Sequence, residues 1–77
     1  MAIKVLFFGQ LTDVTGSQSL EIENIADTNA LQQKLQELYP ALIHTQYRIA
    51  VDKQIITENT LLHQAATAAL LPPFSGG

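Results

Sequence analysis

A single helix-type pattern limits what this chain of 77 residues can fold into. Residues 27–40, DTNALQQKLQELYP, contain an apolar stripe of leucines at positions i, i+4 and i+7: Leu31, Leu35 and Leu38. Asp27 or Thr28 is suited to cap the N-terminus of this helix, and the closing proline disfavours its continuation. Since a helix with one apolar face must bury that face on another element, the remaining residues have to supply a sheet.

Short runs on both sides of this helix alternate as strands do and are rich in β-branched and aromatic residues. The predicted strands are residues 2–8, 19–23, 47–52, 53–56 and 68–72. The turn-rich residues 9–18 are expected to form the long tip of a hairpin, and a tight turn is expected at Asp52 and Lys53. Residues 57–67 are expected to be a loop with one turn of helix. The segment AATAAL also suits a helix, but the two prolines after it favour a strand.

The order of these elements predicts an α+β fold, with one main helix packed on a mixed sheet of about five strands. In such a layout the first and last strands commonly lie side by side in the centre. The last strand then delivers the C-terminal residues from a rigid sheet. The chain has no cysteine to staple so small a core, and 47% hydrophobic residues make purely apolar packing feasible.

The first strand carries large apolar side chains on both of its faces. Leu6 and Phe8 share a face with Lys4, so the face away from the expected core is not cleanly polar. Two interpretations are open: ordinary burial of a central strand on both sides, or cover by a partner.

The residue types exclude several catalytic chemistries. Without cysteine there is no disulfide, thiolate nucleophile or cysteine-based zinc site, and this is compatible with the reducing cytoplasm in which we expect the protein to work. His44 and His63 have no adjacent acid at a recognisable spacing, so we expect surface or packing roles and no metal site. The serines and glycines match neither a nucleophile elbow nor a phosphate loop, and the domain alone is expected to be a poor enzyme.

Charge and hydropathy argue against nucleic acid and membrane as partners. The net charge is −3, and the basic residues are scattered along the sequence: Lys4, Lys34, Arg48 and Lys53. Phosphate contacts need a dense basic patch, which this pattern does not predict. No stretch approaches the roughly 18 apolar residues of a membrane span, and the N-terminal apolar run is too short for a signal peptide.

The C-terminal residues LLPPFSGG are the segment most suggestive of function. Pro72 and Pro73 end the last strand and favour an extended exit, and Gly76 and Gly77 have no side chain to block passage through a narrow channel. The carboxylate at the end becomes an acyl donor when ATP adenylates it, and an incoming sulfide then yields a thiocarboxylate. The alternative is a frayed terminus or a remnant of cloning.

The start, IKVLFFGQLTDVTG, and the end, ALLPPFSGG, resemble the small sulfur-carrier subunits of molybdopterin synthase (the MoaD type). Together with the thiamin-pathway carriers (the ThiS type) these subunits form the ubiquitin-like sulfur carriers, whose fold is the β-grasp. The resemblance spans the whole chain and includes AVDKQII in its centre, and the paired prolines favour the molybdopterin branch. It implies a β-grasp domain of residues 1–71 followed by an extended Gly-Gly tail of residues 72–77.

The resemblance also implies a chemistry and a set of partners. A dedicated adenylyltransferase would activate the carboxylate of Gly77, which would then carry the thiocarboxylate. The tail would enter the active site of the large synthase subunit and give its sulfur to cyclic pyranopterin monophosphate. ATP and magnesium would belong to the activating enzyme and no cofactor to this chain, and the expected assembly is a heterotetramer.

The family's partner surface is an apolar patch on the sheet beside the tail. The residues of this chain expected to bind partners are Phe8, Ile55, Leu71, Pro72, Pro73, Phe74 and Ser75. The chain departs from the family in LHQAATAA, which lacks the acidic turn common before the last strand, and in Asp52, where Asn is common. Two alternatives stay open: a carrier of another pathway, such as thiamin or a tungsten cofactor, and a ubiquitin-like interaction module that transfers nothing.

Overall fold

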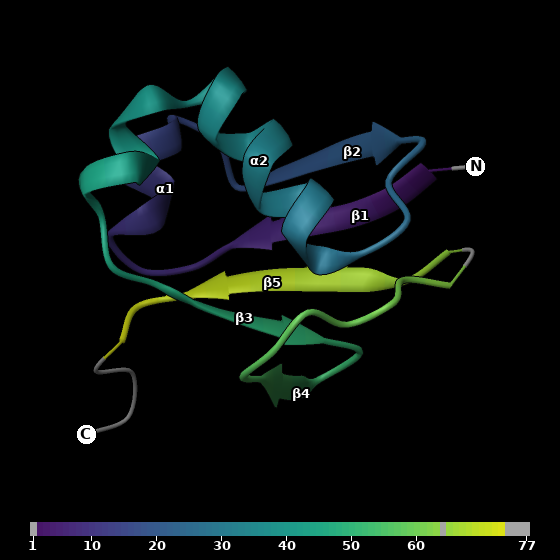
Figure 1. The fold of residues 1–77 in the computed structure, drawn as a ribbon. Coiled ribbons are helices and arrows are strands. Elements are labelled where there is room, and N and C mark those ends of the chain that lie inside the picture. The colour runs from purple at the N-terminus through teal and green to yellow at the C-terminus, as the bar shows by residue number, and fades with distance from the viewer. Residues whose placement is uncertain (1, 64, 74–77) are drawn as a thin grey trace.

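The computed structural model describes residues 2–63 and 65–73, which form one mixed sheet with helices on one of its faces (Figure 1). The strands are β1 (Ala2–Phe7), β2 (Ser19–Glu23), β3 (Arg48–Val51), β4 (Gln54–Ile56) and β5 (Thr67–Leu71). The helices are α1 (Leu11–Thr15), α2 (Thr28–Leu38) and the 3₁₀ helix η1 (Pro40–His44). The predicted α+β class, the five-stranded sheet and the single main helix are confirmed.

The strand order across the sheet is β2-β1-β5-β3-β4. β1 and β5 lie side by side and parallel near the middle, as predicted, and the other neighbours pair antiparallel. Residues 67–71 form a strand although their alanines favour a helix, because β5 finds ladder partners on both sides and buries Ala68 and Leu70 completely. Tertiary pairing therefore outweighs the intrinsic helix propensity of alanine here.

Helix α2 crosses the sheet and supplies the middle of the core (Figure 1). Asp27 is its N-cap and accepts a hydrogen bond from the amide nitrogen of Ala30 at 2.9 Å. Leu31 and Leu35 have no exposed surface, but Leu38 is 47% exposed, so its predicted burial was wrong. Leu38 ends the helix beside the edge strand β2, and no further strand of the described residues lies there to cover it.

Residues 9–18 are not merely a hairpin tip, because helix α1 lies within them and buries Leu11 completely. Gly9 and Gly16 mark the two sides of this short helix. Gly16 is its C-cap in the left-handed region, with φ 71°, and donates its amide hydrogen to the carbonyl of Thr12 at 2.8 Å. The two glycines that indicated a loop therefore flank a short helix, and Gly16 ends it. The 3₁₀ helix η1 was also not predicted.

The expected turn of helix within residues 57–67 does not appear in the described part of that segment. The loop instead bonds to the start of α2. Thr28 donates its amide hydrogen to the carbonyl of Thr60 at 2.9 Å, and Leu62 donates to Ala26 at 2.8 Å. No helix in the described residues is long and apolar enough to span a membrane. The division at residue 71 into domain and tail stays a prediction, since residues 74–77 lie outside the described part.

Candidate partner-binding groove beside the C-terminal exit

The face of the sheet opposite α2, here called the outer face, carries a row of apolar residues that crosses four strands. The row follows from the register: Leu6 pairs with Ala69, Ala69 with Ala50, and Ala50 with Ile55. The neighbours of these residues along each strand, such as Val5 and Ile49, point to the helix side and are buried. Strand alternation therefore leaves this row on the outer face.

The sizes of these side chains make the row concave. Two alanines lie in the middle strands, and larger side chains rise on both sides, so a groove of about 580 Å³ forms over β5 and β3. We call it the apolar groove. Its lining consists of Leu6, Phe8, Ala50, Asp52, Lys53, Ile55, Thr67, Ala69 and Leu71. A contiguous apolar surface of this kind is typical of a protein-interaction site.

The structure brings together the three sheet residues that the sequence predicted to bind a partner. Phe8 and Ile55 are 44% and 53% exposed, and Leu71 is half-buried. The amide of Phe8 donates to the carbonyl of Leu70 at 3.1 Å, so the ladder positions Phe8 although β1 ends one residue earlier. Of the two interpretations of the first strand, complete burial on both faces is therefore wrong. That a partner covers this face stays a prediction.

Gly9 and Pro72 together determine how the chain leaves the sheet. Gly9 has φ +58°, and a Cβ atom placed on it would lie 2.7 Å from Cγ of Pro72. Only glycine allows the first proline of the exit to pack this closely on the end of β1. Gly9 is thus a positioning residue that the sequence indicated only as a turn former.

The turn between β3 and β4 is anchored to the start of β5 by Asp52. Asp52 and Lys53 both have positive φ, 48° and 74°, as in the tight turns that join twisted strands. The carboxylate of Asp52 accepts the amide hydrogen of Thr67 at 3.1 Å and contacts Nε2 of His63 at 2.5 Å. The hydrogen bond from His63 is the main cause that lowers the pKa of Asp52. His63 is exposed, in keeping with the predicted surface role, and the fold brings it an acid that its sequence neighbours do not supply.

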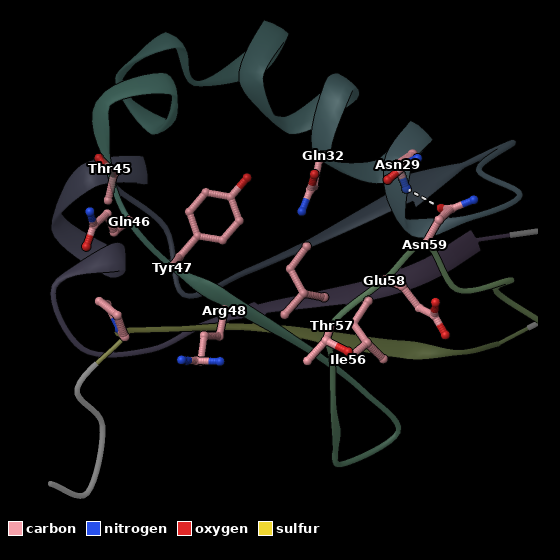
Figure 2. A pocket seen from close by; sticks show the side chains of 12 residues that line it. Asn29, Gln32, Thr45, Gln46, Tyr47, Arg48, Ile56, Thr57, Glu58 and Asn59 are labelled. Carbon is pink, nitrogen blue, oxygen red and sulfur yellow. Dashed lines mark hydrogen bonds between the residues drawn. The ribbon is translucent and has the colours of Figure 1, made fainter.

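A second groove, of about 690 Å³, lies on the helix side of β3 and β4 (Figure 2). Its lining comes from α2, from residues 45–47, from β3 and β4, from the loop after β4 and from Pro73, and most of these residues are polar, Arg48 among them. Asn59 accepts the amide hydrogen of Asn29 at 2.9 Å there and joins that loop to the helix. Burial raises the pKa of Tyr47, and a hydrogen bond with Gln36 partly offsets this. This groove is larger but lacks the apolar floor that suits a protein partner.

The remaining predicted site residues lie at the end of the described part. Pro72 and Pro73 follow β5 and are half-buried, whereas Phe74, Ser75, Gly76 and Gly77 lie outside the described residues. Within residues 2–63 and 65–73, no group of His, Asp or Glu side chains is arranged to hold a metal ion.

A main helix on a five-stranded mixed sheet, with a central last strand that ends beside an apolar groove, defines a ubiquitin-like domain of the β-grasp class. The sequence belongs more narrowly to the ThiS family, whose sequence model matches residues 5–77. The resemblance to the ThiS and MoaD type of carrier is therefore confirmed.

Individual relatives agree with this assignment. The molybdopterin synthase sulfur carrier subunit of Caenorhabditis briggsae is 32% identical over 83 residues, covering 100% of this chain and 99% of the relative. A solved complex of subunits 1 and 2 of molybdopterin-converting factor from Helicobacter pylori contains a chain 29% identical, with a TM-score of 0.75 and complete coverage of both chains. The molybdopterin converting factor subunit 1 from Pyrococcus furiosus has a TM-score of 0.87 at 18% identity, covers 95% of this chain and 98% of its own, and supports the fold alone.

Proposed function

We propose that this chain is the sulfur carrier subunit of a molybdopterin synthase. The observation that carries the proposal is the position of β5. β5 pairs with β1 on one side and with β3 on the other, ends at Leu71 beside the apolar groove, and is followed by residues 72–77. A fully extended segment of that length reaches about 20 Å, enough to enter a partner's active site while the groove stays docked.

The chemistry takes place at the carboxylate of Gly77, in the active sites of other proteins. A carboxylate oxygen attacks the α-phosphorus of ATP, pyrophosphate leaves, and an acyl adenylate forms in the activating enzyme. Sulfide attacks the carbonyl carbon, displaces AMP and leaves a thiocarboxylate. In the large subunit the sulfur forms a bond to a carbon of cyclic pyranopterin monophosphate in place of an oxygen substituent, and water then cleaves the acyl–sulfur bond and restores the carboxylate. The dithiolene takes two such transfers.

The structure of this chain supports a carrier role. Its contribution is to fix the point at which the C-terminal segment leaves the sheet. Pro72 packs on Gly9, and β5 is held by its ladders to β1 and β3. The name of the relative from Caenorhabditis briggsae and the two-subunit complex from Helicobacter pylori support a large-subunit partner for this chain.

Intact-mass spectrometry tests the proposal. After incubation with its cognate activating enzyme, ATP and sulfide, the protein should gain the mass difference between one sulfur and one oxygen atom. Addition of the large subunit and the pterin precursor should reverse that gain and produce molybdopterin. A variant without Gly77 is the control and should not gain mass. An unchanged mass of the wild-type protein would support an interaction module that transfers nothing, and discharge only to a thiazole synthase would support a thiamin-pathway carrier.

A further inference from the structure

The fold gathers basic residues that are scattered in the sequence. Lys4, Arg48 and Lys53 are all exposed on the outer face or at its edge. Lys4 lies between the core residues of β1, Arg48 pairs with Leu71 across the ladder, and Lys53 lines the apolar groove. The remaining basic residue, Lys34, lies on α2 on the other side of the sheet.

Two of these cations, Arg48 and Lys53, have no carboxylate opposite them in the described ladders. Lys4 differs, because it stands directly opposite Glu21 in the β1–β2 ladder, a cross-strand arrangement that favours opposite charges. The carboxylate of Asp52, which is next to Lys53 in sequence, already accepts the amide of Thr67 and contacts His63. Among the described residues, neither Arg48 nor Lys53 takes part in an ion pair.

Lys53 and Arg48 stand at the two ends of β3. Lys53 lines the apolar groove, whereas Arg48 lines the second groove and lies opposite Leu71, a lining residue of the apolar groove. A protein that covers the apolar groove as far as Leu71 therefore contacts Lys53, comes next to Arg48 and removes part of the hydration of both cations. Desolvation of a charge is unfavourable unless an opposite charge compensates it.

We propose that the large subunit that covers the apolar groove presents carboxylate side chains to Arg48 and Lys53. This inference rests on the proposed function, because that function makes the large subunit the occupant of the groove. It runs against the simplest expectation from the net charge of −3, which favours a basic partner. The local arrangement predicts that charge reversal at Arg48 or Lys53 raises the Kd for the large subunit. The total charge predicts that the same substitutions lower it.

Charge reversal separates the two expectations. The variants are R48E, K53E, the double variant and K34E, which changes the net charge by the same amount as either single reversal. Binding to the cognate large subunit is measured by isothermal titration at low and high salt, and circular dichroism checks that each variant is folded. We expect R48E and K53E each to raise Kd about threefold to tenfold at low salt, and K34E to change it by less than about twofold.

Salt should reduce these differences, because screening lengths fall to about 3 Å at 1 M ionic strength. Tighter binding of R48E and K53E, or equal effects of R48E and K34E, would show that total charge governs the encounter and would overturn the proposal. Unchanged binding by the double variant would also overturn it and would leave the proposed function intact. If the wild-type protein itself does not bind the large subunit, the proposed function and this inference both fail.

Discussion

The contact between Gly9 and Pro72 gives a prediction with a matched control. In Gly9→Ala the new methyl group meets Cγ of Pro72 at 2.7 Å, and the residue must also keep φ +58°. In Gly16→Ala the backbone is equally left-handed, with φ +71°, but no atom lies within 4 Å of the new methyl group. The left-handed conformation costs a non-glycine residue about 1 kcal/mol, and overpacking adds about 1–3 kcal/mol.

We therefore expect Gly16→Ala to lower the free energy of unfolding by about 1 kcal/mol and Gly9→Ala to lower it by about 2–4 kcal/mol. Urea unfolding followed by circular dichroism measures both, since a small domain loses about 1 kcal/mol of stability for each molar of urea. Pro72→Ala removes Cγ and leaves Cβ at an ordinary 4.0 Å from the new methyl group. The variant with both Gly9→Ala and Pro72→Ala should then regain about 1–3 kcal/mol relative to additivity.

Equal destabilisation by Gly9→Ala and Gly16→Ala would refute this reasoning. So would additive effects of Gly9→Ala and Pro72→Ala, because the argument requires the two residues to touch. Either result would mean that Gly9 serves only the local turn and does not position the exit of the chain.

Three further predictions follow from burial, charge and shape. Leu31→Ala should lower the free energy of unfolding by about 2–5 kcal/mol and Leu38→Ala by less than about 1 kcal/mol, as measured by urea unfolding, because only the first is fully buried. Since its pKa is lowered in the folded protein, Asp52 should stabilise the fold above its ordinary pKa of 3.8 and lose that effect as the pH falls through the lower folded value. His63→Ala should reduce this acid dependence in urea titrations at successive pH values, and an unchanged pH profile would contradict it. Ala69→Leu should fill the floor of the apolar groove and raise the Kd for the large subunit at least about tenfold, while the thermal midpoint stays within a few degrees. Unchanged binding would show that the partner does not enter the groove.

The sequence predicted those features that depend on local periodicity. The spacing of Leu31 and Leu35 defines the buried side of α2, and alternation in β1 separates Val5 from Leu6. Strand alternation also explains why the expected partner residues, including Ile55, emerge on one face once the strands pair. Each of these inferences needs only the geometry of one helix or one strand.

Features that depend on contacts between distant segments were not predictable in this way. The acid partner of His63 comes from the turn after β3, and Pro72 meets Gly9 only because β5 lies next to β1. The exposure of Leu38 follows from where α2 ends relative to the edge of the sheet. The helical spacing of the leucines carries no information about that position. Such features follow from the assembled topology, and the sequence pattern of each segment is compatible with several topologies.

The central position of β5 has a consequence for the synthesis of the protein. Segments made earlier, from β1 to β4, cannot complete the sheet, because the strand that joins β1 to β3 is the last to leave the ribosome. A chain that stops before Ala68 lacks the buried side chains of Ala68 and Leu70, and with Ala69 it lacks one of the two alanines of the groove floor. A molecule in which the apolar groove has formed has therefore been translated at least through β5, the strand that leads to the proposed reactive end.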